Sequence, residues 1–471
     1  MYFNVHWRLA KINMSDKGYE VSHESIEKIH NWGYNMFKNK KFAKHGITFM
    51  VIGFIYNFFF TGLMTDHMNI LTPYMIANYG WDDLKITNPT TIGAALVIVV
   101  YLVIGTAFLK FGIKKIVIPT ILVLALSCAG VALAGDNYSI YFVSLLLIRM
   151  LVVPLQMGSF MLAANWFIKY RGRVLGLITA GSPLFSIIGI GFLTVLVSAI
   201  GLNAYLVLSV MLLATAVFTY FGIKDTPEEL GLFPDGSDKA PLSEESHEDI
   251  EAISLKEILT DKRAWQLIIS YGILFFVIVG SMGYMAVRYI SLSGPNDTPN
   301  LFVSKAIIWL AVGAAAGIPM SYVLGFIDDK FGSIKASLLL VALFLFAIIP
   351  LAIMPVGGNV PLMIVWAFGV ACMTGGMPTM HPCVTSYVYG RKRYMAANKW
   401  IMTMQAIPTA FVYPFMGALN QSGNLTMAYY IMIGLLAIAF VTILSMSKIP
   451  DANAADRDYG LKVVDAQELT T

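Results

Sequence analysis

Long apolar stretches constrain the fold of this chain more than any other feature of its sequence. They recur from about residue 45 to residue 447, and each has about the 20 residues that a helix needs to cross a bilayer. Hydrophobic residues make up 57% of the chain and charged residues only 13%, whereas about a quarter of a soluble domain is charged. The expected spans are residues 45–78, 90–110, 116–135, 138–168, 174–199, 202–222, 264–290, 302–328, 334–354, 360–389, 395–419 and 426–447. The sequence therefore predicts an all-α polytopic membrane protein with twelve transmembrane helices.

A short pattern occurs twice, each time at the end of an apolar span. Residues 105–115 read Gly-Thr-Ala-Phe-Leu-Lys-Phe-Gly-Ile-Lys-Lys, and residues 325–335 read Gly-Phe-Ile-Asp-Asp-Lys-Phe-Gly-Ser-Ile-Lys. The same offset relates the basic loop at 169–173 to the basic loop at 390–393. A repeat of this size in a hydrophobic chain indicates two pseudo-symmetric six-helix bundles, and a transporter holds its substrate at the interface between such bundles.

Basic residues predict the orientation and the domain limits. Lysine and arginine gather beside every second span end, and the opposite loops hold little beyond Lys85 and Lys305. The positive-inside rule then places both termini in the cytoplasm of a multi-pass cell-membrane protein. The expected domains are a cytoplasmic segment (1–44), a first bundle (45–222), a cytoplasmic linker (223–263), a second bundle (264–447) and a cytoplasmic tail (448–471).

Two further patterns fall outside the spans. Apolar residues at 21–37 suggest an amphipathic helix at the membrane surface, and Ser254 followed by Glu257 is a capping box that predicts the start of a short helix. Residues 244–251 are acidic, which is typical of a solvated linker.

Six spans, a linker and six more spans, together with the doubled G-x3-D-x2-G-x2-K pattern, resemble the major facilitator superfamily over residues 45–447. Three stretches look closest to its branch of oxalate/formate antiporters and monocarboxylate transporters: residues 165–176, 227–234 and 375–382. The resemblance implies two bundles that rock around a site near the middle of the membrane. It also implies that spans one, four, seven and ten line the central cavity.

The chain departs from that branch at three positions. Relatives place an arginine before a proline in span eight, where this chain has Ile318, and the lysine that oxalate carriers have in span eleven aligns with Gln405. The first copy of the repeat has Leu109 where the second has the acidic Asp329. These differences argue against oxalate itself and predict a lopsided charge latch.

Asp66 and Arg149 are the strongest candidates for the substrate and proton pathway. Ionisable residues inside apolar spans are costly and therefore rare, and an arginine cannot lose its charge. Both lie about 30 Å from the cytoplasmic ends of their helices at 1.5 Å per residue, so we expect them to meet. They would form either a proton- or substrate-coupled pair or a static ion pair that holds spans one and four together.

Other polar residues are expected to share this pathway. Arg288 lies two residues past the repeat equivalent of Asp66. It is expected near the outer mouth of the cavity, facing the first bundle, either to capture an anion or to reach the lipid head groups. His67 could titrate and contribute to proton coupling, but it points about 100° away from Asp66, which is the better candidate. His381 is either a group that lines the cavity or a hydrogen-bonded histidine packed between helices. The uncharged candidates are Asn57, Gln156 and Gln405.

The repeated pattern is also expected to form a cytoplasmic gate whose charges separate when the transporter opens inward. Its residues are Gly105, Gly112, Gly325, Asp329, Gly332 and Lys335.

We therefore expect a secondary active transporter of a small organic anion, a carboxylate, by alternating access and with proton coupling. Proton-antiport efflux of drug-like amphipathic compounds and a transport-inactive nutrient sensor are the alternatives. No nucleotide-binding or catalytic motif occurs, so we expect no enzyme activity. Cys128, Cys372 and Cys383 lack metal-ligand spacing, and no metal or cofactor is expected. The expected partners are the substrate, protons and the lipid bilayer; we expect a monomer that does not bind nucleic acid.

Overall fold

The computed structural model of this chain describes residues 39–237, 253–292 and 299–454. Within those ranges, ten helical segments are long and apolar enough to cross a membrane. Two of them, at 171–222 and 360–421, have 52 and 62 residues. About 20 residues suffice for one crossing, so each of these two holds a pair of crossings. The twelve transmembrane helices predicted from the sequence are confirmed.

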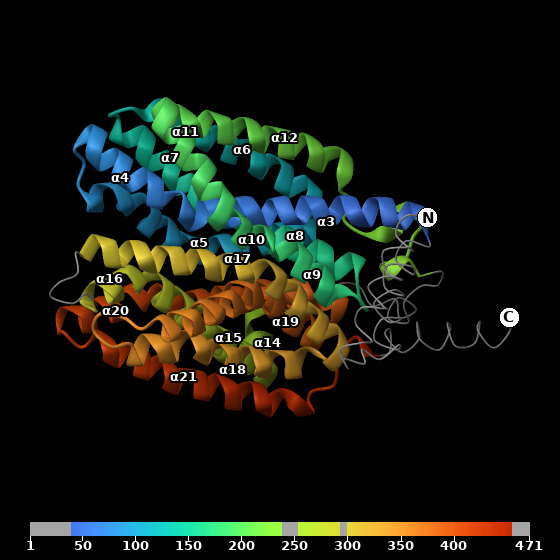
Figure 1. The fold of residues 1–471 in the computed structure, drawn as a ribbon. Coiled ribbons are helices and arrows are strands. Elements are labelled where there is room, and N and C mark those ends of the chain that lie inside the picture. The colour runs from blue at the N-terminus through green and yellow to red at the C-terminus, as the bar shows by residue number, and fades with distance from the viewer. Residues whose placement is uncertain (1–38, 238–252, 293–298, 455–471) are drawn as a thin grey trace, which may run out of the picture.

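The first bundle is drawn from blue to green in Figure 1. Its elements are α3 (Lys40–Thr61), η1 (Gly62–Asp66), α4 (Met68–Tyr79), α5 (Asp83–Phe111), α6 (Ile113–Ala134), α7 (Tyr138–Leu151), α8 (Val153–Trp166), α9 (Arg171–Thr179), α10 (Gly181–Leu184), η2 (Phe185–Gly189), α11 (Ile190–Ile200), η3 (Gly201–Asn203) and α12 (Ala204–Gly222). The first, fourth and fifth crossings are therefore each built from more than one helix.

The second bundle, drawn from yellow to red, lies alongside the first (Figure 1). Its elements are α15 (Lys262–Gly283), α16 (Met285–Ser291), α17 (Pro299–Phe331), α18 (Ser333–Ile353), α19 (Val360–Ala410), α20 (Val412–Gln421) and α21 (Leu425–Ser445). The long α19 holds parts of two crossings, because Gly390 breaks it with a φ of 70° and a ψ of 172°. Such a positive φ is readily adopted only by glycine.

The segment between the bundles contains three short elements: η4 (Pro227–Leu230), η5 (Pro234–Gly236) and α14 (Leu255–Thr260). Ser254 caps α14 by accepting a hydrogen bond from the Glu257 amide at 3.2 Å, so the predicted helix start is confirmed. The amphipathic helix expected at 21–37 and the acidic stretch at 244–251 lie outside the described residues. We call the end of the bundles at which α3 and α15 begin the linker end, and the opposite end the far end.

The repeated pattern forms equivalent turns in the two bundles. Gly112 separates α5 from α6 with a φ of 86°, and Gly332 separates α17 from α18 with a φ of 88°. In the first bundle, the carboxylate of Asp225 accepts hydrogen bonds from the amides of Ile113 and Lys114, both at 2.9 Å. Burial raises the pKa of Asp225, and these two amide hydrogen bonds oppose that shift. The turn is therefore held by the backbone conformation of glycine and by a carboxylate at a helix N-terminus.

Candidate functional site

Two π-helical turns from different crossings meet in the first bundle. One is η1 in the first crossing, where the His67 amide bonds to the Gly62 carbonyl, and the other is η2 in the fifth crossing. The hydroxyl of Ser186 on η2 donates a hydrogen bond to Asp66 Oδ2 at 2.6 Å, and Thr65 donates to Asp66 Oδ1 at 2.9 Å. Single π turns in α-helices are frequent at functional sites. This hydrogen-bonded pair of turns is the core of the candidate site.

Arg149 lies on the same layer as Asp66 but binds a different group. Its Nη1 donates a hydrogen bond to the carbonyl oxygen of Met64, inside the η1 turn, at 2.9 Å. Its aliphatic stem packs over Gly93 of α5, where a Cβ would lie 2.7 Å from the arginine Cγ. Asp66 and Arg149 are both partly exposed. The arginine thus reaches the first crossing two residues from the candidate acid.

The direct ion pair expected between Asp66 and Arg149 is absent among the described contacts of Asp66, which are with Thr65 and Ser186. A π turn adds a residue to one turn of the helix, and a side chain beyond it is therefore displaced by about 100° around the axis. The displacement turns Asp66 toward η2 and its hydroxyl donor Ser186. The sequence pattern gave no sign of this turn.

His67 and Asn57 point into the packing of the first bundle. His67 is buried, and its Nδ1 lies 2.9 Å from the hydroxyl of Tyr205 on α12. Asn57 is buried, and its Nδ2 donates hydrogen bonds to the Gly53 carbonyl at 2.9 Å and to Ser159 Oγ at 3.1 Å. Gln156 is also buried, on α8 below Arg149. His67 is therefore a hydrogen-bonded residue packed between helices of the first bundle.

His381 and Gln405 form a hydrogen-bonded pair inside the second bundle. His381 Nε2 lies 2.9 Å from Gln405 Oε1, and the Gln405 amide donates to the Leu267 carbonyl at 3.0 Å. The rings of Tyr271 and Phe275 pack edge-on against the imidazole with centroid distances of 5.4 and 5.7 Å. The structure therefore brings together two residues that the sequence analysis proposed separately.

Arg288 lies elsewhere than expected. It is 6% exposed, donates from Nε to the Leu351 carbonyl of α18 at 2.9 Å and faces the ring of Tyr429 on α21 at 5.7 Å. These partners all belong to the second bundle, so the expectation that Arg288 faces the first bundle across the cavity mouth is wrong. Its position in the repeat did not predict the side of the helix on which it lies.

The two bundles are in close contact at their linker ends. A Cβ on Gly172 of α9 would collide with the Gly325 carbonyl of α17, and one turn further a Cβ on Gly176 would collide with the Ser321 carbonyl. Deeper still, the hydroxyls of Thr179 and Thr379 lie 2.7 Å apart across the interface. We call this stack of contacts the gate. These contacts extend from the linker end to about 12 Å along α9, and contacts of α10 and η2 with α17 continue toward the layer of Asp66.

Asp329 is the acidic residue of the gate. Its carboxylate accepts hydrogen bonds from the amides of Gly172 at 2.9 Å and Arg173 at 3.1 Å, and it forms an ion pair with Arg173 Nε at 3.3 Å. It therefore caps the N-terminus of α9 across the bundle interface. Lys335, from the same pattern, is exposed on α18.

The first-bundle copy of the pattern is built differently. Gly105 packs against the stem of Lys399 on α19, whose ammonium donates to Thr106 Oγ1 at 3.2 Å. Leu109 stands where the second copy has its acid. The acidic side chain near the first copy comes instead from the segment between the bundles, where Glu228 pairs with Arg391 of α19 at 2.7 Å. A second such pair joins Glu257 and Arg393 at 2.5 Å.

Four residues of this region escaped the sequence analysis: Arg171, Ser186, Asp328 and Lys399. Lys399 is an ionisable residue within an apolar span, and that signal was present in the sequence. Ser186 became a candidate only when the π turn placed it against Asp66. Arg171 is 1% exposed and donates to Ser386 Oγ at 2.6 Å, whereas the sequence suggested an ordinary basic loop.

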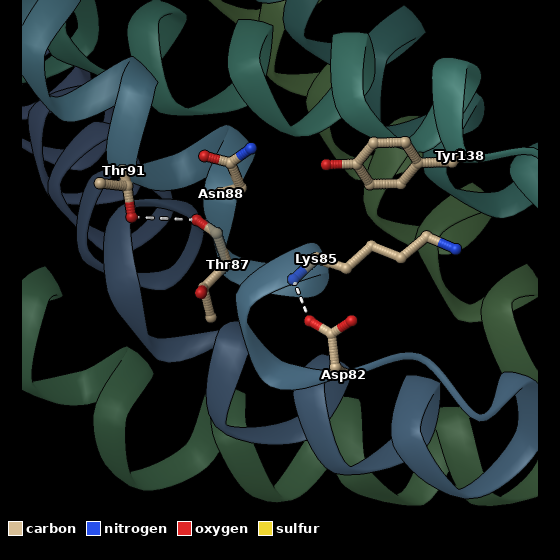
Figure 2. A pocket seen from close by; sticks show the side chains of 6 residues that line it. All are labelled: Asp82, Lys85, Thr87, Asn88, Thr91 and Tyr138. Atoms are coloured by element: carbon tan, nitrogen blue, oxygen red, sulfur yellow. Dashed lines mark hydrogen bonds between the residues drawn. The ribbon is translucent and has the colours of Figure 1, made fainter.

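A pocket of about 620 Å³ opens at the far end of the first bundle (Figure 2). Figure 2 shows the Lys85 side chain beside the Tyr138 ring, and the Lys85 ammonium lies 4.2 Å from the centroid of the Trp81 ring. The lining residues are Asp82, Lys85, Thr87, Asn88, Thr91 and Tyr138. All of them belong to the first bundle, so this pocket is not the site between the bundles.

Comparisons with known proteins agree with this architecture. The sequence profile of the Major Facilitator Superfamily matches residues 49–398. The Inner membrane transport protein RhmT of Escherichia coli is 23% identical over 234 residues, which are 47% of this chain and 54% of that protein. The match thus spans about half the length of this curated relative.

Solved transporters share the fold. The Escherichia coli fucose:proton symporter FucP superposes with a TM-score of 0.62 at 15% identity, covering 86% of this chain and 100% of that one. The proton:xylose symporter XylE, bound to 6-bromo-6-deoxy-D-glucose, gives a TM-score of 0.68 at 11% identity, covering 88% and 99%. The profile match over most of the chain, the twelve crossings and the doubled gate pattern show that this protein is a secondary transporter that belongs to the Major Facilitator Superfamily.

Proposed function

We propose that the protein carries a small organic anion, a carboxylate, across the cell membrane together with a proton, by alternating access. The observation that carries this proposal is the layer formed by Asp66, Ser186 and Arg149 directly above the closed gate. In this layer, Arg149 is a permanent cation. The carboxylate of Asp66 is held in place by hydroxyl groups and not by a cation.

The cation supports an anionic substrate. Arginine stays charged in proteins, and its planar donors match a carboxylate with two parallel hydrogen bonds. The described hydrogen bond of Arg149 goes to an uncharged backbone carbonyl, an acceptor that a substrate carboxylate would outcompete on charge. Lys399, at the interface of α5 and α19, adds a second positive charge between the bundles.

The acid supports proton coupling. Asp66 is partly exposed, and one of its two hydroxyl donors comes from another crossing. A movement of η2 relative to η1 would remove the Ser186 hydrogen bond, which stabilises the ionised form. The carboxylate would then take up a proton, so that its charge depends on the state of the bundles.

Orientation and assembly are part of the same proposal. The linker end carries the basic loops of the chain, so we place it and both termini in the cytoplasm. The structure then corresponds to a carrier that is closed on its cytoplasmic side. We propose that the monomer is the transporting unit, because the layer is complete within one chain.

Uptake into proteoliposomes tests the proposal. A panel of labelled small carboxylates is offered with and without an imposed pH gradient, to the native protein and to the Arg149→Gln and Lys85→Gln variants. We expect the gradient to drive accumulation of at least one carboxylate. We expect Arg149→Gln to lose at least tenfold in uptake and Lys85→Gln, a cation of the far-end pocket, to behave as the native protein.

The outcomes separate the alternatives. Accumulation that ignores the pH gradient overturns proton coupling. Extrusion of cationic dyes with no uptake of any carboxylate favours proton-antiport efflux of amphipathic compounds. Tight binding of a carboxylate without transport favours the nutrient sensor.

A further inference from the structure

Asp235 has an unusual backbone conformation at the linker end of the first bundle. It belongs to η5, and its φ is 57° and its ψ is 10°. It is the only residue other than glycine with a positive φ among those that the structure describes. A side chain disfavours this left-handed conformation, which persists only where the surroundings hold the residue in place. The contacts of the Asp235 carboxylate show what holds it there.

The carboxylate of Asp235 binds the amides of the loop between α8 and α9. Its Oδ2 accepts hydrogen bonds from the amides of Ile168 at 3.0 Å and Lys169 at 2.8 Å, and its Oδ1 accepts one from the amide of Tyr170 at 3.4 Å. The helix α9 begins at the next residue, Arg171. The chain therefore enters α9 with its backbone fixed by a side chain from the segment between the bundles.

The amides that α9 presents to the second bundle follow directly after this loop. Those of Gly172 and Arg173 donate to Asp329 of α17 at 2.9 and 3.1 Å. Consecutive peptide planes are joined only through φ and ψ, so fixing the amides of 168–170 restricts the direction of the amides of Gly172 and Arg173. Asp235 from the first bundle and Asp329 from the second thus bind neighbouring amides of one loop and helix start.

The segment that carries Asp235 is anchored to the first bundle. We call residues 224–236 the strap. Lys41 Nζ of α3 and Trp166 Nε1 of α8 donate hydrogen bonds to strap carbonyls at 2.8 and 3.1 Å. Asp225 of the strap accepts the amides at the start of α6. The strap is therefore tied to three helices of the first bundle besides the loop before α9.

The second bundle has an equivalent contact. The amide of Arg391, the repeat equivalent of Arg171, donates to Asn453 Oδ1 at 3.1 Å, and Asn453 Nδ2 donates to the Ser386 carbonyl at 2.8 Å. Asn453 follows the last crossing of the second bundle, as Asp235 follows the last crossing of the first. In both halves, a short polar side chain beyond the last crossing fixes the backbone where the fifth crossing begins.

We propose that Asp235 is a positioning residue of the gate: it directs the amides at the start of α9 toward Asp329 and so stabilises the closed linker end. The strap is anchored in the first bundle and moves with it, whereas the cap by Asp329 exists only while the gate is closed. Loss of the Asp235 carboxylate therefore weakens the closed state more than the open state. The inference deepens the alternating-access function proposed above and rests on it.

Distances between the bundles of the full chain, without substrate, test this role. Spin labels are placed at Lys115→Cys of α6 and Lys262→Cys of α15, two exposed positions at the linker end, with the three native cysteines replaced by alanine. Pulsed electron paramagnetic resonance gives the ratio of long to short distances. Asp235→Gly removes the carboxylate but supplies a residue that readily adopts the positive φ. Asp235→Asn keeps one acceptor oxygen in nearly the same shape.

Asp225→Asn is the matched control, because Asp225 is a carboxylate of the same strap that caps α6. The helix α6 packs against α5, α7, α8 and α12 of the first bundle. We expect Asp225→Asn and Asp235→Gly both to lower the thermal midpoint. Only Asp235→Gly should raise the ratio of long to short distances, by about fivefold as for the loss of a helix cap. Asp235→Asn should give a ratio between that of Asp235→Gly and that of the native chain.

A double-mutant cycle with Asp329→Ala distinguishes positioning from a general loss of stability. If Asp235 acts through Asp329, Asp235→Gly should raise the ratio little further once the cap by Asp329 has been removed. A fully additive effect in the double variant overturns the proposal. So does a native ratio in Asp235→Gly, or an equal rise in Asp225→Asn.

Folding of the variants is part of the test. If Asp235→Gly does not fold, a native ratio in Asp235→Asn overturns the proposal and a raised ratio supports it. Failure of both Asp235 variants to fold assigns Asp235 to folding and overturns the proposal as well. Because no substrate is present, a negative result here is distinguishable from a failure to transport any carboxylate.

Discussion

Arg173 of α9 and Asp329 of α17 form an ion pair, with 3.3 Å between Nε and Oδ2, that joins the two bundles at their linker ends. The carboxylate also caps α9 through two amides, so a single side chain links a helix N-terminus of one bundle to the other bundle. The first-bundle copy of the pattern has no such acid and depends on Glu228 and Arg391 instead. The two copies of the pattern therefore differ in their ion pairs, and the lopsided latch expected from the missing acid at position 109 stays a prediction.

Asp329→Asn should open the gate. Removing one partner of a buried ion pair costs about 3–5 kcal/mol, and part of that loss falls on the closed state alone. A cysteine placed at Thr179, which is buried in the gate, should then react with a maleimide from the linker side at least tenfold faster than in the native background. Lys335→Gln, at an exposed position of the same pattern, serves as the control, and an equal rate in the two variants contradicts a latch role for Asp329.

Asp66→Asn should separate proton coupling from substrate binding. The amide cannot carry the proton, but its oxygen can still accept a hydrogen bond from one of the hydroxyls of Ser186 and Thr65, and its NH2 group can donate to the other. In proteoliposomes we expect exchange of labelled for unlabelled substrate to continue while accumulation driven by a pH gradient falls to background. Accumulation at the native level would show that Asp66 does not carry the coupled proton.

Gly176→Ala should prevent closure of the gate. The added Cβ would meet the backbone of Ser321 and Tyr322, which cannot move aside as a flexible side chain can. We expect at least a tenfold loss of uptake with little loss of folded protein, since the bundles can still exist apart. Gly191→Ala, further along the same crossing with no atom within 4 Å of its Cβ, should retain native uptake.

Tyr205→Phe should affect stability and not coupling. The hydroxyl of Tyr205 is the described hydrogen-bond partner of His67, and losing it from a buried site costs about 1–3 kcal/mol. We expect a lower thermal midpoint in detergent and an unchanged pH dependence of uptake. A shift of the uptake profile along the pH axis would instead assign His67 to the proton pathway.

Asp261→Asn should destabilise the protein in a manner that depends on pH. Burial acts to raise the pKa of Asp261, but hydrogen bonds from Arg263 and Tyr389 outweigh it and hold the pKa below its ordinary value. A depressed pKa contributes stability above the ordinary carboxyl pKa of about 4, and this stability is lost as the pH falls through the folded-state value.

The native chain should therefore be more stable than Asp261→Asn at pH 7, by about 1 kcal/mol for a charged helix cap, and the difference should shrink below pH 4. Thermal unfolding in detergent at several pH values measures it. Thr260→Ala, at the preceding position, controls for local substitution. A difference that stays constant from pH 7 to pH 3 would contradict the role of the Asp261 charge.

Much of the fold was predictable because it depends on local properties. The length of an apolar stretch determines whether a helix can cross a bilayer, and so the twelve crossings and the two-bundle repeat could be derived by inspection. The turns at Gly112 and Gly332 were marked by glycine for the same reason, since their backbone conformation excludes other residues. Depth along a helix was also accessible: Asp66 and Arg149 were expected on one layer, and Arg149 does bond to η1.

Orientation around each helix could not be derived in the same way. One extra residue in the π turn of the first crossing directs the Asp66 side chain toward Ser186. No residue pattern in the sequence predicts such a π turn. Arg288 faces the interior of the second bundle for a similar reason, because packing against α18 and α21 decides its direction.

The sequence by itself determined the membrane-spanning architecture, the pseudo-symmetry and the family, since these follow from apolar length, charge placement and a repeated motif. Only the tertiary structure decided which partners an acid has. Asp328 and Asp329 are neighbours in the chain, yet Asp329 has two amide donors and an arginine while Asp328 has neither kind of donor among the described residues. The physical reason is that the free energy of an ionised group depends on its solvation and on its neighbours in space. The residues next to it in the chain do not determine either.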